Sequence, residues 1–113
     1  MRRFPGVRVG LAVVRGRSML PTLRDGDRLL VRYGAEPRAG GLAVVRLPDG
    51  VVAVKRLELH DHDGFWFTRD NPDEGLDSWS FGCPSPREAV LGTVLGRAWP
   101  RPSTLRRPVP RGV

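Results

Sequence analysis

Short runs of apolar residues, many of them β-branched, recur along the chain and are separated by glycine, proline and aspartate. The runs cover residues 7–14, 28–32, 42–47, 51–59, 65–68 and 89–94. Alternation with a period of two and β-branched residues favour strands, whereas Gly, Pro and Asp clusters favour turns. No run keeps a helical spacing for more than two turns. The pattern therefore predicts an all-β fold of short antiparallel strands, barrel-like or sandwich-like.

The length of 113 residues is enough for one domain with a modest core. We expect this domain to span residues 7–99, after a short basic arm over residues 1–6. Residues 100–113 are rich in proline and arginine, and we expect this tail to be disordered. No stretch approaches the ~20 apolar residues that cross a bilayer, and Arg8 interrupts the first run where a secretory signal would be apolar. Cys83 has no second cysteine to pair with, so these features together predict a soluble, cytoplasmic protein.

The net charge of +7 permits an anionic partner, such as nucleic acid or membrane headgroups. Much of the charge lies near the chain ends, and all basic residues but one are arginine, which indicates a compositional bias. The aromatic run Phe65, Trp66 and Phe67 could stack on bases. A strand places at least one of these rings inside, however, so packing is favoured and nucleic acid is the less favoured partner.

The exception among the basic residues is Lys55, the only lysine of the chain. A buried lysine can lose its proton, whereas an arginine effectively cannot. In a strand over residues 51–57, Lys55 shares a face with Val51, Ala53 and Leu57, and the strand holds no carboxylate. Such surroundings lower the pKa of a lysine and make it a candidate general base. The alternative interpretation is a lysine that extends from a strand edge to solvent.

A candidate nucleophile, Ser18, lies between the first two predicted strands. Pro21 and the cluster Asp25, Gly26 and Asp27 exclude a regular helix around it. Ser18 is therefore expected on a non-helical loop that faces a cleft. A serine beside a neutral lysine is a known variant of the nucleophile–base arrangement.

Four segments in order resemble the signal peptidase I family of serine peptidases, and the SOS-repressor autoproteases share a looser form of the pattern. Residues 18–23 (SMLPTL), followed by Gly26 and Asp27, are similar to the family's nucleophile box. Residues 54–56 (VKR) resemble its lysine box, residues 70–82 its third box and residues 90–94 its closing strand. The resemblance runs from about residue 14 to residue 94.

This resemblance implies a small catalytic core in which Ser18 is the nucleophile and Lys55 the general base, with no metal or cofactor. The oxyanion would be held by the backbone N–H of Ser18 and a neighbouring donor. Met19 would help to shape the cleft, and Gly16 stands where some members carry a hydroxyl donor. A protein precursor would bind as an extended strand. Four residues would support the site: Asp70, Asn71, Asp77 and Ser78.

Two departures from the family pattern fall in the third box. Gly75 stands where some members carry a serine that bonds the lysine, and Trp79 stands where an arginine commonly pairs with Asp77. We therefore expect that ion pair to be lost, and Ser78 or Ser80 to orient Lys55 instead.

As a small chain that resembles this family and shows no membrane anchor, the protein is similar to the maturation proteases of nickel-type superoxide dismutase. This likeness implies that the protein removes an N-terminal propeptide from such a precursor. Two alternatives stay open: a catalytically idle peptide-binding module of the same fold, and a basic nucleic-acid-binding β-barrel.

His60 and His62 flank Asp61, but alternate residues in a turn rarely close a metal site, so we interpret them as a solvated loop.

Overall fold

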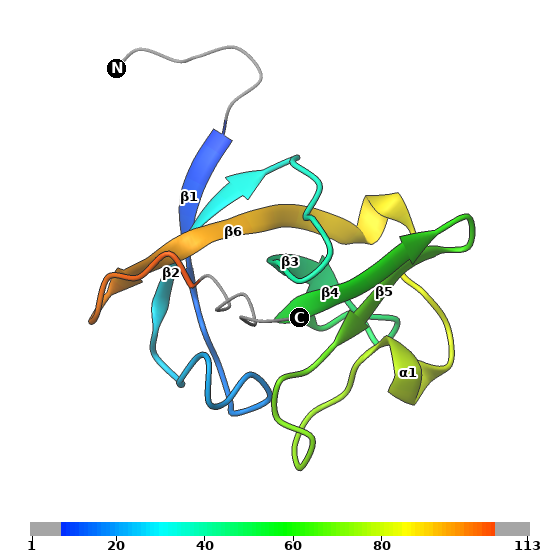
Figure 1. Ribbon diagram of the computed structural model, residues 1–113, viewed down its shortest axis with the longest axis horizontal. Helices are drawn as coiled ribbons and strands as arrows, with labels where there is room; N and C mark the ends of the chain where they lie inside the picture. The colour runs from blue at the N-terminus through cyan, green and yellow to red at the C-terminus, as the bar shows by residue number, and fades with distance from the viewer. Residues whose placement is uncertain (1–7, 106–113) are drawn as a thin grey trace, which may run out of the picture.

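The computed structural model describes residues 8–105, which form one open antiparallel sheet of six strands (Figure 1). The strands are β1 (Arg8–Val13), β2 (Arg28–Tyr33), β3 (Leu42–Arg46), β4 (Val52–Asp61), β5 (Gly64–Thr68) and β6 (Val90–Trp99). Their order in the sheet is β1-β2-β6-β3-β4-β5, so β1 and β5 are its edges. The predicted all-β fold class is confirmed.

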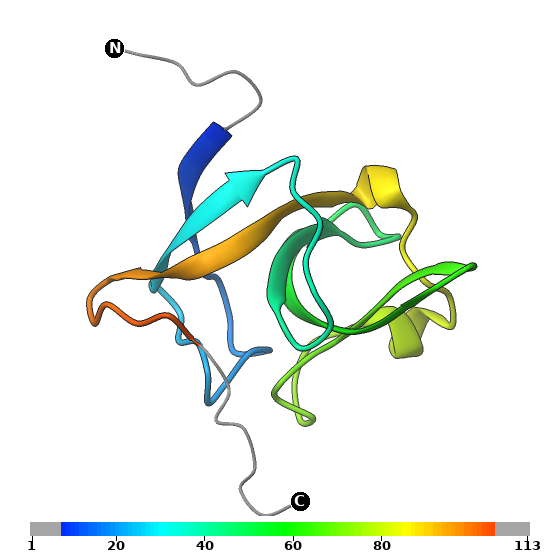
Figure 2. The same ribbon diagram turned by 45° about the horizontal axis from the view of Figure 1, so that its top comes forward.

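Strand β6 joins the two halves of the sheet, because it pairs with β2 on one side and with β3 on the other. Figure 2 shows this long strand, in orange, running across the molecule between the two halves. Gly92 allows the close crossing, since a Cβ atom there would lie 2.7 Å from the carbonyl oxygen of Arg32. One apolar cluster forms around Leu23, Leu29 and Val31, and a second, built from β3, β4 and β5, forms around Leu57 and Phe67.

Two elements differ from the sequence prediction. Strand β6 continues beyond residue 94 to Trp99 because its later part pairs with β2. The segment between the apolar runs 65–68 and 89–94, where the sequence pattern predicts no helix, contains the one-turn helix α1 (Ser78–Phe81). Asp77 caps this helix, and Ser80 completes a capping box whose local hydrogen bonds support a single turn. A 3-10 turn, η1 (Arg87–Ala89), precedes β6.

The basic arm expected over residues 1–6 lies outside the described residues, as do residues 106–113 of the expected tail. The chain after β6 turns back at first, since Ser103 and Arg97 exchange two backbone hydrogen bonds of 2.8 and 3.0 Å. The disorder expected for residues 100–113 stays a prediction, because residues 106–113 lie outside the described residues. Between residues 8 and 105, no helix has the length and apolar character needed to cross a bilayer.

Candidate active site

Ser18 lies in the turn-rich loop that leaves β1, and residues far along the chain fix its backbone. The backbone N–H of Asn71 donates to the carbonyl oxygen of Ser18 at 2.9 Å. The side-chain amide of Asn71 donates to the carbonyl oxygen of Arg17, also at 2.9 Å. As expected, no helix forms here. Asn71 therefore holds the backbone of the loop at both Arg17 and Ser18.

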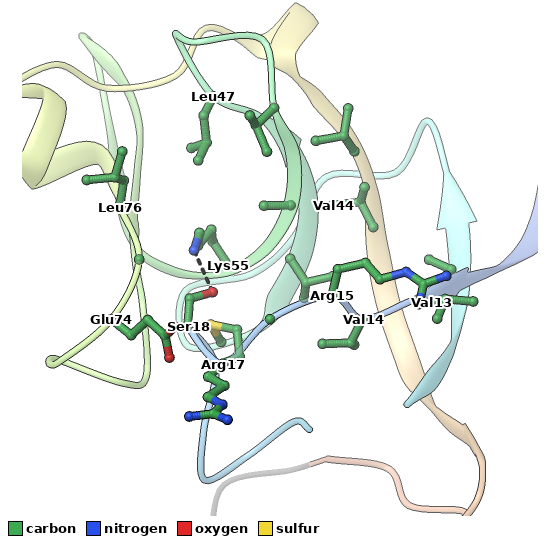
Figure 3. A pocket seen from close by; sticks show the side chains of 18 of the residues that line it. Val13, Val14, Arg15, Arg17, Ser18, Val44, Leu47, Lys55, Glu74 and Leu76 are labelled. Carbon is green, nitrogen blue, oxygen red and sulfur yellow. Dashed lines mark hydrogen bonds between the residues drawn. The ribbon is translucent and has the colours of Figure 1, made fainter. Parts of the chain in front are cut away.

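Lys55 projects from β4 toward this loop and is only 2% exposed. Its Nζ lies 2.8 Å from Ser18 Oγ, within hydrogen-bond distance (Figure 3). No carboxylate in the described part of the chain forms a salt bridge with it. Burial lowers the pKa of Lys55 below its ordinary value of about 10.5; the more distant charges of Asp77 and Asp49 oppose this shift, and Arg69 adds to it. A lysine that loses its proton in this setting can accept the proton of the Ser18 hydroxyl.

A buried ion pair lies behind the nucleophile loop. The Arg56 guanidinium donates to both carboxylate oxygens of Asp70, at 2.8 and 2.7 Å, and both side chains are about 5% exposed or less. The Thr22 hydroxyl donates to the same carboxylate, and the Asp70 backbone N–H lies 3.4 Å from Met19 Sδ. Asp70 thus connects β4 to the segment that carries Ser18. Sequence reasoning gave Arg56 no role, although its place directly after the lysine put it on the opposite face of the strand.

The ion pair that an arginine at position 79 would make with Asp77 is absent, as expected, but Arg69 supplies a guanidinium to Asp77 from a different position. Arg69 Nη1 lies 3.1 Å from Asp77 Oδ2. Burial alone would raise the pKa of Asp77, but hydrogen bonds from Ser80 and from the Arg69 backbone, together with the Arg69 charge, bring that pKa below its ordinary value. Asp77 therefore remains an anion that caps α1 near the site.

Ser78 and Ser80 do not orient Lys55, contrary to expectation. The hydroxyl of Ser78 accepts a hydrogen bond from the Phe67 backbone at 2.8 Å, and that of Ser80 bonds Asp77 and Arg69. Ser78 supports the site by fixing α1 to β5. Lys55 is oriented by its strand and by Ser18.

Gly75 packs directly against the nucleophile. A Cβ atom at this position would lie 2.5 Å from Ser18 Cβ, and its φ of +94° is a conformation that other residues rarely adopt. The site therefore has no room for a serine at position 75. Trp79, the second departure, stacks on Trp66 with ring centroids 4.3 Å apart and donates to Glu58.

The resemblance implies that the Ser18 N–H and a neighbouring donor hold the oxyanion, and Gly16 is not available as that neighbour. The Gly16 N–H donates to the Asp25 carboxylate at 2.8 Å, so it is already engaged. The Ser18 N–H, by contrast, has no acceptor between residues 8 and 105. Ser18 can therefore offer both the nucleophilic oxygen and a backbone donor.

A cleft of about 370 Å³ opens at Ser18 and Lys55, between the end of β1 and the start of β4 (Figure 3). Gly16 and Met19 are among the residues that line it. Arg15 and Arg17 bring positive charge to the side of β1, and Glu74 and Asp49 bring negative charge from other loops. The remaining lining is largely apolar: Ala12, Val13, Val14, Val44, Leu47, Val51, Val52, Ala53, Val54 and Leu76.

Within residues 8–105, two strand edges that border this cleft have no pairing partner. The backbone N–H of Val14 donates to the carbonyl oxygen of Asp27, on the side of β2. Neighbouring residues of an antiparallel strand direct their backbone groups to opposite sides, so the N–H and C=O of Val13 point to the open side of β1. At the start of β4, the Leu47 N–H donates to the carbonyl oxygen of Val51, on the side of β3. By the same alternation, the N–H and C=O groups of Val52 and Val54 point away from β3. Strand β5 pairs with β4 only from Arg56 onward. Both edges therefore present free backbone groups to an extended chain.

The other candidate residues have structural roles. Phe65 and Phe67 are buried, while Trp66 lies at the surface against Trp79. His60 stacks on Phe65 with ring centroids 3.8 Å apart, and Cys83 is exposed with a free thiol. Across residues 8–105, no three or more His, Cys, Asp or Glu residues are grouped so that they could hold a metal ion.

These features define a small all-β domain with a serine–lysine pair in a largely apolar cleft. The family model described as Peptidase S24-like matches residues 5–79, which include Ser18, Lys55 and Asp77. Because this match covers about two thirds of the chain, the protein belongs to the Peptidase S24-like family. A comparison with curated proteins finds no match. Membership indicates a peptidase-type function and leaves the substrate open.

Proposed function

We propose that the protein is a serine endopeptidase with Ser18 as nucleophile and Lys55 as general base. The observation that carries the proposal is the 2.8 Å contact between Lys55 Nζ and Ser18 Oγ, made by a lysine that is 2% exposed. Burial without a salt bridge favours the neutral amine, which is the form that can take a proton.

In the proposed reaction, Ser18 Oγ attacks the scissile carbonyl carbon while Lys55 Nζ takes the hydroxyl proton. The Ser18 N–H donates to the oxyanion that forms. The Lys55 ammonium then gives its proton to the leaving amine, and the C–N bond breaks to leave an ester on Ser18. Water attacks this ester with Lys55 again as the base, and the proton returns to Ser18 Oγ as the carboxylic acid leaves.

The substrate would bind as an extended strand between the two open edges. Backbone hydrogen bonds to Val13 on one side and to Val52 and Val54 on the other would hold the peptide irrespective of its sequence. The apolar lining of the cleft would then select the side chains that point into it. This arrangement brings a scissile carbonyl to Ser18 at the end of the cleft.

We propose that the substrate is a protein precursor with an N-terminal propeptide, and that the precursor of a nickel-type superoxide dismutase is the first candidate. The small size of the domain and the Trp-containing stretch at residues 77–82 (DSWSFG) suit such a protease and support this choice. The reaction would take place in the cytoplasm, where an exposed thiol such as that of Cys83 stays reduced.

The test is an intact-mass measurement on this precursor after incubation with the native protein, with Ser18→Ala and with Lys55→Arg. We expect loss of the propeptide mass with the native protein alone. Lys55→Arg keeps the positive charge and removes the titratable amine, so it separates a base from a structural cation. Equal cleavage by either variant contradicts the mechanism, and no cleavage by the native protein rejects this precursor as substrate.

A further inference from the structure

Arg69, the residue that follows β5, connects the segments on both sides of the cleft wall. Its guanidinium donates to the carbonyl oxygens of Asn71 and Pro72 and to the side chains of Asp77 and Ser80, each at 3.1 Å. The family pattern has an arginine at position 79 instead, where this chain has Trp79. The guanidinium that pairs with Asp77 therefore comes from the segment directly after β5, and not from α1.

We propose that Arg69 is a positioning residue of the Ser18–Lys55 pair: it pairs with the Asp77 carboxylate and holds the Asn71 segment against Ser18. This inference rests on the proposed function.

The effect of Arg69 on the protonation of Lys55 follows from the charges around that lysine. The charges that shift its pKa are those of Asp77 at the N-terminus of α1, Arg69 after β5, and Asp49 in the turn between β3 and β4. Arg15, Arg17 and Glu74 also line the cleft. Asp77 alone would stabilise the Lys55 ammonium, which cannot accept the proton of Ser18. Arg69 opposes this effect, because its positive charge repels the ammonium and so offsets the attraction of Asp77.

The effect of Arg69 on the position of Ser18 follows from the contacts of Asn71. Arg69 Nε bonds the carbonyl oxygen of Asn71, whose N–H and side-chain amide bond the carbonyl oxygens of Ser18 and Arg17. A single guanidinium thus fixes the carboxylate near the base and the backbone behind the nucleophile. A change at Arg69 alters both the protonation of Lys55 and the position of Ser18.

The single lysine of the chain allows a direct measurement that does not need turnover. Protein grown with lysine labelled by 13C at Cε gives one side-chain signal, whose titration midpoint reports the protonation of Lys55. We compare the native protein with Arg69→Gln, Asp77→Asn, the double variant and Arg69→Lys, each checked for folding by its thermal unfolding. Arg69→Lys keeps the charge and loses the planar fork.

We expect the midpoint of Lys55 to move to higher pH in Arg69→Gln and to lower pH in Asp77→Asn. The double variant should lie between the two single variants, and Arg69→Lys should stay closer to the native protein than Arg69→Gln. If Arg69→Gln fails to fold, the double variant compared with Asp77→Asn gives the same test, with the midpoint again higher when Arg69 is absent. A midpoint that is unchanged or lowered on loss of Arg69 overturns the inference, whether or not the native protein cleaves a substrate.

Discussion

Replacement of Gly75 by alanine tests whether the cleft wall sets the position of the nucleophile. The added Cβ would lie 2.5 Å from Ser18 Cβ, and real Cβ atoms essentially never approach other atoms closer than 3.0 Å. The two segments must therefore separate by about 3.0 − 2.5 = 0.5 Å or more. Because the Ser18–Lys55 contact is a directional bond of 2.8 Å, this displacement acts directly on the reacting pair.

The expected loss can be worked out from the size of this displacement. A misplacement of 1 Å at a catalytic centre costs about a hundredfold in rate, so a shift of half that size predicts a loss of about tenfold or more in kcat/KM. Alanine at a φ of +94° also costs about 1–2 kcal/mol of folding stability.

Gly34→Ala is the matched control, because Gly34 has a φ of +78° and a Cβ added there would meet no atom within 4 Å. Both variants should lose free energy of unfolding in urea because of the positive φ, and Gly75→Ala should lose more because of its contact with Ser18. Only Gly75→Ala should lose activity in a peptide-cleavage assay. Gly75→Ala with activity equal to that of Gly34→Ala would refute the assignment of Gly75 as the wall that positions Ser18.

Lys55→Met should be inactive yet more stable than the native protein at neutral pH, because it removes a buried ionisable group. Between the lowered pKa of Lys55 in the fold and its ordinary value, the unfolded chain binds more protons, so native stability rises with pH there. The advantage of Lys55→Met in thermal unfolding, about 1.4 kcal/mol for each unit of pKa lowering, should therefore shrink as pH rises, and an advantage that grows would contradict this. By the same titration, kcat/KM should rise with pH through a value below ~10.4; a flat profile would argue against Lys55 as the base. Arg56→Met should cost about 3–5 kcal/mol in urea unfolding because it removes the guanidinium that compensates a buried carboxylate. Arg87→Met, which removes an exposed pair with Glu36, should cost about 1 kcal/mol or less, and equal costs would speak against the burial argument.

Most of the fold follows from local sequence patterns, and the differences arise where tertiary contacts extend or replace them. The six strands lie where β-branched runs between turn residues place them. Strand β6 is longer than its apolar run because it must pair with β2 as well as β3, a requirement that no local pattern contains. The Asp77–Ser80 spacing is compatible with the one-turn helix α1, but a glycine and a proline nearby make a loop the simpler interpretation of the sequence.

The candidate pair is predictable because it depends on residue type, while its supports depend on geometry. A lone lysine among arginines in an apolar strand identifies Lys55, and the loop residues identify Ser18. Arg69 escapes prediction because its partner Asp77 lies across a loop, and nothing in the spacing shows which arginine would reach it. The sequence alone presents Gly75 as the loss of a serine, although the close approach of Ser18 requires glycine there.

The most direct test of the central claim is the appearance of new N-termini in a complex protein mixture. A denatured protein extract is incubated with the native protein, with Ser18→Ala and with Lys55→Arg, and the newly formed N-termini are mapped by mass spectrometry. The account predicts a set of new N-termini with the native protein that both variants lack. The same set with either variant, or no new N-termini with the native protein over a pH range that spans the titration of Lys55, would contradict a Ser18–Lys55 peptidase.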